Sequence, residues 1–155
     1  MDEFAQAATE GNALYDAVEE VLRGPEISLA NHGQPPYLDK DGNPRHKARV
    51  AWWRESVSTL RGLAVMDGPF TTESGQPYPD LPDIELQASE RSFSYESDIP
   101  VFGHYWRNGV PEEGRDWTAH TACVDFSAVK TGDLVAYRWD GESEIRADHY
   151  VGVGT

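Results

Sequence analysis

The sequence predicts a mixed α/β (α+β) fold, with helices in its first part and strands in its last part. Near the N-terminus, apolar residues recur with the spacing of one helix face, beginning at Leu14. Residues 66–98 are instead rich in Gly, Pro, Ser and acidic residues, which is typical of loops. Beyond residue 99, short apolar segments alternate with turn residues, which indicates strands. We therefore divide the chain into a mainly helical region (1–65), a loop-rich region (66–98) and a β meander (99–155).

The first helix is expected to end at Arg23. Its apolar residues share one face: Leu14, Val18, Val21 and Leu22. Arg23 complements the helix dipole, and the Gly-Pro pair that follows stops the helix. Further along, DKDGNP (39–44) has the spaced oxygens of a calcium loop. Such a loop ends in Glu at its twelfth position, where this chain has Ala51, so a solvated turn is predicted instead.

A second helix is predicted over 45–63, where four apolar residues share a face: Val50, Trp53, Val57 and Leu60. At least one of the adjacent Trp52 and Trp53 is expected in the core, with a stacking surface as the alternative. The segment also holds the locally basic residues of this acidic chain, namely Arg45, His46, Lys47, Arg49, Arg54 and Arg61. These side chains either contact a phosphorylated substrate or offset neighbouring carboxylates.

Four strands are predicted in the last third of the chain, over 99–102, 121–126, 133–139 and 149–153. The Asp140-Gly141 pair is a tight-turn signal that allows the last strand to pair back with the third. Cys123 is the only cysteine, which excludes an intrachain disulfide and a cysteine-rich zinc site. We expect it to be a small buried apolar residue.

The charge of the chain limits its partners. A net charge of −14 and a pI of about 4.6 argue against binding to nucleic acids or to anionic membranes. No apolar run approaches the roughly 20 residues that a membrane-spanning helix needs. The N-terminal MDEFAQAATEGN lacks the basic and apolar segments of a signal peptide. We expect a soluble, cytoplasmic protein with no nucleic-acid or membrane partner.

The candidate functional residue is His104, in the segment PVFGHYW. It follows Gly103 directly after a predicted strand, where loops at the end of a sheet carry ligands and catalytic groups. The other four histidines lie in turns, at a helix start or beside strands, and we do not expect them to be ligands.

The sequence continues from PVFGHYW through a Gly/Pro loop to TACVDFSAVKTGDLVAYRWDGE. This order is similar to the C-terminal portion of calcineurin-like metallophosphoesterases, in the bacterial branch grouped with diadenosine tetraphosphatases and serine/threonine protein phosphatases. Three earlier segments also occur in the family's order, so the resemblance covers nearly the whole chain. They are GNALYDAVEEVLRGPEI, DKDGNPRHKARVAWW and YPDLP. It implies that the chain is the C-terminal part of a four-layer α/β/β/α sandwich.

The resemblance implies roles for individual residues. His104 would be the last protein ligand of a two-metal centre, for which an imidazole suits Mn, Fe, Zn or Ni. Gly103 would permit close backbone approach and unusual dihedral angles before the ligand. Asp125 would orient His104, or else it is an acid that caps a strand end. Three arginines are candidates for contacting phosphate: Arg45, Arg49 and Arg107.

The rest of the family's metal centre is missing from this sequence. No GDxH, GDxxDRG or GNH(D/E) motif is present, and Trp106 replaces the second His of a Gly-His-x-His motif. One imidazole cannot hold two metal ions, so we expect the divalent metals in the complete domain and no activity from this chain alone. A truncated gene, a mis-set start at Met1 or a split polypeptide would explain this.

In the complete enzyme, a metal-bound hydroxide would hydrolyse a phosphoester or phosphoanhydride in a phosphorylated small molecule or a phosphoprotein. The alternative is a non-catalytic interaction module or the remnant of a decayed phosphatase gene. Under either interpretation, self-association or pairing with the missing N-terminal half would cover exposed apolar sheet faces.

Overall fold

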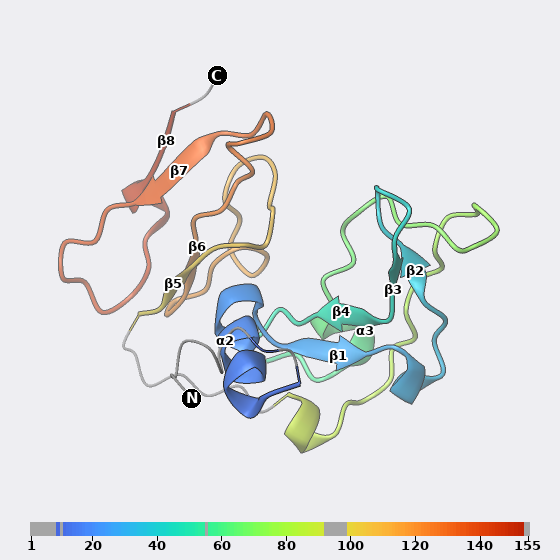
Figure 1. Ribbon diagram of the computed structural model, residues 1–155. Helices are drawn as coiled ribbons and strands as arrows, with labels where there is room; N and C mark the ends of the chain where they lie inside the picture. Colours follow the sequence, from blue (N-terminus) through green and yellow to red (C-terminus); the bar gives the residue numbers. More distant parts are fainter. Residues whose placement is uncertain (1–8, 10, 55, 92–98, 154–155) are drawn as a thin grey trace. The chain divides into compact units, whose positions relative to one another are not determined.

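The computed structural model describes residues 9, 11–54, 56–91 and 99–153, and the chain divides into two compact units, Met1–Phe93 and Ser94–Thr155 (Figure 1). We call them the N-terminal and C-terminal units. The N-terminal unit combines α-helices with short strands, and the C-terminal unit holds strands joined by irregular connections. The general mixed α/β class is therefore confirmed, in the form of small two-stranded sheets.

The first predicted helix is confirmed as α2 (Ala13–Arg23). The side chain of Asn12 caps its start by accepting a hydrogen bond from the Leu14 N–H at 2.9 Å. Gly24 ends the helix with a φ of 80°, and its N–H donates to the carbonyl oxygen of Glu20. None of the residues of α2 is buried, and Val21 on the apolar face is 85% exposed.

The predicted helix over 45–63 is wrong, and the described part of the region 1–65 contains short strands as well as helices. The N-terminal unit instead contains two antiparallel strand pairs: β1 (Glu26–Ser28) with β4 (Lys47–Arg49), and β2 (Tyr37–Leu38) with β3 (Pro44–Arg45). Among the described residues of 45–63, helical structure is limited to α3 (Leu60–Leu63), which begins after the N-cap Thr59. Of the four residues of the predicted face, Val50, Trp53 and Leu60 are buried and Val57 is partly buried, but pairing with the distant β1 decides the backbone conformation at the start of the segment.

The core of the N-terminal unit is built from β1, β4, α3 and the chain that follows them. Its buried residues are Ile27, Leu29, Ala48, Val50, Leu60, Leu63, Ala64, Leu81 and Leu86. Trp53 is also fully buried, and its ring lies edge-on to Trp52 with the centroids 5.8 Å apart, so the core interpretation of this pair is confirmed. Two short 3-10 helices, η1 (Ala30–His32) and η2 (Ala88–Glu90), are joined by a 2.9 Å contact between His32 Nε2 and Glu90 Oε1.

The solvated turn predicted at residues 39–44 connects β2 to β3. The Oδ1 atom of Asp39 accepts hydrogen bonds from the N–H groups of Asp41 and Asn43 at 3.0 and 2.9 Å. Its Oδ2 atom accepts from Arg45 Nε at 2.9 Å. These bonds, with that from Asn43 contributing most, lower the pKa of Asp39 to about 2.

All four strands predicted in the C-terminal unit are present, with shorter bounds. They are β5 (Val101–Phe102), β6 (Ala122–Cys123), β7 (Leu134–Tyr137) and β8 (Tyr150–Val153). The short helix η3 (Ala147–His149) leads into β8. The meander expectation is correct for β7 and β8, which are antiparallel, and wrong for β5 and β6, which are parallel.

The long connection 103–121 between β5 and β6 packs back onto β6. Its Trp117 forms a small core with Ala122 and Ile145, against which Tyr137 and Tyr150 of the β7–β8 pair are packed. In the parts of the chain described above, no helix combines the length and the apolar character that crossing a bilayer requires.

Candidate functional site

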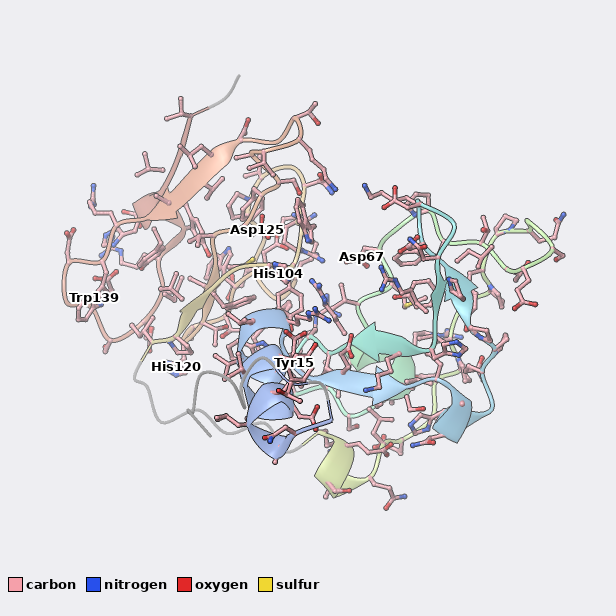
Figure 2. All side chains as sticks on the ribbon, viewed as in Figure 1. Tyr15, Asp67, His104, His120, Asp125 and Trp139 are labelled. Atoms are coloured by element: carbon pink, nitrogen blue, oxygen red, sulfur yellow. The ribbon has the colours of Figure 1, made fainter. Side chains whose placement is uncertain are left out.

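The parallel pair β5–β6 brings two of the predicted site residues to one end of a sheet. Phe102 is paired with Cys123, and His104 and Asp125 each lie two residues beyond their strand. Because the strands are parallel, both residues lie at the carboxyl end of the pair, as Figure 2 shows. His120 precedes β6 and lies at the opposite end. The carboxyl end of parallel strands is where α/β proteins place ligands.

Backbone strain is concentrated at this same end. Among the described residues, three that are not glycine have a positive φ: His104 at 69°, Trp106 at 52° and Ser127 at 60°. All three lie in the loops that directly follow β5 and β6. A left-handed conformation costs about 1–2 kcal/mol for a residue with a Cβ, and such strain gathers at functional sites. We therefore define the candidate site, called the His104 site, as His104, Trp106, Asp125, Ser127 and Lys130.

Asp125 holds the backbone of both loops. Its Oδ2 atom accepts a hydrogen bond from the N–H of Trp106 at 3.1 Å, and its Oδ1 atom accepts one from the N–H of Ser127 at 3.2 Å. Its main-chain oxygen accepts from the N–H of Arg107 at 3.0 Å. The sequence indicated an orienting partner for His104 or a strand-end cap, and the Asp125 carboxylate accepts these hydrogen bonds from main-chain N–H groups of the two loops that follow β5 and β6.

Gly103 does not supply the unusual dihedral angles expected of it. Its φ lies outside the left-handed region, and a Cβ there would lie 3.5 Å from the Cβ of Asp125, an ordinary contact distance. The left-handed conformation falls one residue later, on His104. The imidazole is exposed, in keeping with a group that meets a ligand rather than the core.

Sequence reasoning missed two side chains of the site. The ring of Trp106 has its centroid 6.3 Å from that of His104, and it is 39% exposed. The Nζ atom of Lys130 lies 4.2 Å from the centroid of the Trp106 ring, in a cation–π contact. Trp106 could have been found as the second aromatic after the Gly-His pair. No local sequence pattern predicts that Lys130 belongs to the site, because a turn after β6 brings it to the loop after β5.

The three arginines suggested as phosphate contacts are placed in other surroundings. Arg107 is 6% exposed, and its Nε atom lies 2.6 Å from Oδ1 of the fully buried Asp116. Its guanidinium therefore anchors the 103–121 connection. Arg45 pairs with Asp39 in the N-terminal unit, and Arg49 is a partly buried residue of β4 in that unit.

Asp116 collects several donors. Besides Arg107, it accepts from Arg115 at 2.6 Å and from the N–H of Glu112 at 3.0 Å. Burial acts to raise the pKa of Asp116, but the hydrogen bonds from Arg115 and Arg107 outweigh it and keep the pKa below its ordinary value. The carboxylate therefore stays ionised and ties the connection together.

The other candidate ligands do not converge on His104. Among the residues placed by the structure, no group of three or more His, Cys, Asp or Glu side chains could hold a metal ion. His149 is buried, with its Nδ1 atom 2.9 Å from Glu142 Oε1. Cys123 is buried as predicted, and burial raises the pKa of its thiol to about 12, which makes it inert. The His104 site can thus offer a metal ion one exposed imidazole, which is too few ligands for a closed centre.

Comparisons with known proteins identified no relative of this chain. No family model matches the chain, and no significant match was found among curated proteins or solved structures.

Proposed function

We propose that this chain is the C-terminal part of a calcineurin-like metallophosphoesterase domain, which hydrolyses phosphoester or phosphoanhydride bonds once the rest of the domain completes its metal centre. The observation that carries the proposal is the position of His104. Its exposed imidazole follows a Gly at the carboxyl end of a parallel strand pair, on a left-handed backbone. That geometry, together with the motif order in the sequence, favours a ligand over a structural histidine.

In this proposal the complete fold is a four-layer α/β/β/α sandwich, and β5 to β8 are strands of one of its sheets. When bound, a pair of divalent ions (Mn, Fe, Zn or Ni) lowers the pKa of a coordinated water and neutralises charge on the phosphoryl oxygens. His104 would donate one imidazole nitrogen to this centre. Asp125 would support that imidazole by holding the backbone of the loop that carries His104, through its bonds to the Trp106 and Ser127 N–H groups. The single, buried Cys123 accords with a cytoplasmic location, which we include in the proposal.

The first test is a hydrolysis assay of the chain with p-nitrophenyl phosphate and Mn²⁺, beside a His104→Ala variant. We expect equal, background rates for both, because a lone imidazole cannot hold two metal ions. Turnover by the unchanged chain well above that of His104→Ala would contradict the claim that the ligand set is incomplete.

The second test reads the DNA immediately upstream of Met1. An in-frame series of GDxH, GDxxDRG and GNH(D/E) would supply the missing ligands, and the longer protein should then hydrolyse p-nitrophenyl phosphate in a manner that His104→Ala abolishes. An upstream region without these motifs, or a longer protein unaffected by the substitution, would contradict the proposal.

A non-catalytic interaction module is the second candidate, and exposed apolar surface favours it. Leu134 and Val153 are cross-strand partners on β7 and β8, and each is 65% exposed. Apolar faces of this kind mark interaction surfaces. Sedimentation of the chain and of a Leu134→Glu, Val153→Glu variant tests self-association through this face. A dimer that the double substitution disperses would favour the module, and a monomer at all concentrations would count against self-association.

A further inference from the structure

Lys130 and His104 lie beside the same indole, although they come from loops that follow different strands. The Nζ atom of Lys130 and the imidazole of His104 lie 4.2 and 6.3 Å from the centroid of the Trp106 ring. Two groups that can carry positive charge are thus brought to one aromatic side chain at the carboxyl end of the β5–β6 pair.

The position of Lys130 is fixed by the backbone of a tight turn. The carbonyl oxygen of Ser127 accepts hydrogen bonds from the N–H groups of Lys130, Thr131 and Gly132 at 2.9, 3.3 and 3.1 Å. The turn closes only around a glycine, because a Cβ at Gly132 would clash with the main-chain oxygen of Phe126. The turn therefore sets the backbone position of Lys130, at a cost in strain at Ser127, and the contact with Trp106 places its ammonium group.

Hydrogen bonds connect this turn to the loop that carries Trp106. The Oγ atom of Ser127 donates to the main-chain oxygen of Arg107 at 2.9 Å, and the carboxylate of Asp125 accepts N–H groups from both loops. Two hydrogen-bonded loops and three strained residues thus maintain the Lys130–Trp106–His104 arrangement. Left-handed backbone strain at residues other than glycine tends to cluster at functional sites.

The charge of the chain and of Lys130 bears on which ligand the site could bind. With a net charge of −14, the chain as a whole repels anions, so an anionic ligand requires a local cation. Lys130 is one of three lysines, and Lys40 and Lys47 belong to the other unit. Within the site, Lys130 places an ammonium group beside the Trp106 ring, and ammonium N–H groups bind phosphate oxygens.

We propose that Lys130 binds the phosphate group of the ligand at the His104 site, with the Trp106 ring positioning its ammonium. The proposal rests on the proposed function, because it assigns the phosphate-binding residue of the same site. It replaces Arg107 in that role, since Arg107 is committed to the buried Asp116.

The test is a ³¹P NMR titration of the metal-free full chain, in EDTA, with inorganic phosphate and with phenyl phosphate. We expect Lys130→Met to weaken the binding of both by about tenfold or more, because a charged hydrogen bond is lost. Lys130→Arg should stay within about threefold of the unchanged chain, since it keeps the charge. Lys40→Met is the matched control: it removes the same charge from an exposed lysine in the β2–β3 turn and should leave binding unchanged.

Each other outcome overturns the proposal. Three outcomes would exclude Lys130 as the residue that binds the phosphate group. They are no phosphate binding by the unchanged chain, unchanged binding by Lys130→Met, and a loss in Lys40→Met equal to that in Lys130→Met. A loss for inorganic phosphate with phenyl phosphate unaffected would exclude Lys130 as the contact of an esterified phosphate. Because EDTA removes metal ions, these results are independent of the upstream motifs that test the proposed function. Lys130-dependent binding without those motifs would contradict the phosphoesterase and leave the phosphate site standing.

Discussion

Strain at His104 is the residue-level feature that sets this loop apart from its surroundings. A φ of 69° is unfavourable for any residue with a Cβ and costs glycine nothing. The imidazole is exposed, so its removal opens no cavity in the core. The strain is therefore measurable by substitution.

His104→Gly should be more stable than His104→Ala by about 1 kcal/mol, because glycine relieves the left-handed strain that alanine keeps. Urea unfolding of the two variants measures the difference. His120 is the matched control, since it is also exposed and lacks a positive φ. There the order should reverse, with His120→Ala the more stable. The same order at both positions would contradict the strain at His104.

The sequence predicted that His104 and Asp125 each follow a strand, but it did not predict what surrounds them. A Gly-His pair after a strand and an acid after the next strand are local signals, and parallel pairing brought both to one end. Lys130 depends on a turn closed by Gly132, and its place over Trp106 arises from tertiary contacts. No spacing rule connects residues that meet across two loops.

At the level of elements, the strands were predictable and their partners were not. Alternation of apolar residues locates a strand without specifying which edge it joins or in which direction, so β5 and β6 were expected in a meander and are parallel. The helix expected over 45–63 failed for a related reason. Its periodic residues are buried by turns and by the pairing of β4 with β1, a contact distant in sequence.

Two glycines beside the site should respond differently to alanine. Gly132→Ala should destabilise the C-terminal unit by several kcal/mol, since its Cβ would clash with a backbone oxygen that cannot move aside cheaply. Gly103→Ala should change stability by less than about 1 kcal/mol, because its Cβ would make an ordinary contact at 3.5 Å. Thermal unfolding followed by circular dichroism measures both. A Gly103→Ala loss as large as that of Gly132→Ala would show that Gly103 is needed after all.

The connection 103–121 depends on one buried carboxylate. Asp116 is 0% exposed and pairs with Arg107 and Arg115, so Asp116→Asn should lower the free energy of unfolding by about 3–5 kcal/mol by leaving a buried charge uncompensated. The exposed ion pair of Glu112 with Arg115 provides the comparison, and Glu112→Gln should cost less than about 1 kcal/mol. Equal losses in urea denaturation would mean that the Asp116 pair does not hold the connection.

At the level of the whole molecule, each unit contains a carboxylate whose pKa is depressed to about 2. In the N-terminal unit it is Asp39, held mainly by the Asn43 N–H. In the C-terminal unit it is Glu142, where desolvation opposes ionisation but hydrogen bonds from Tyr137 and other donors outweigh it. Tyr137 donates to Glu142 Oε1 at 2.6 Å. Protonating either carboxylate breaks bonds that shape a turn.

The depressed pKa values determine the direction of the pH dependence. A carboxylate with a folded-state pKa of about 2 and an unfolded value of about 4 to 4.5 stabilises the fold fully above about pH 5, and this stabilisation is lost as the pH falls toward 2. We expect a constant melting temperature from pH 7 to about pH 5 and a fall between about pH 4.5 and 2. Repulsion within a chain of charge −14 also weakens on acidification, which acts in the opposite sense.

Paired variants separate these two effects. Asp39→Asn should melt at a lower temperature than the unchanged chain at pH 7 and should lose less between pH 5 and 2, because its turn no longer contains a carboxylate to protonate. Asp41→Asn removes the same charge from the same turn and leaves the bonds of Asp39 intact, so it should keep the full acid dependence. Calorimetry from pH 7 to 2 measures both. If the curves of the two variants coincide, repulsion across the whole chain sets the acid response, and the turn at Asp39 does not.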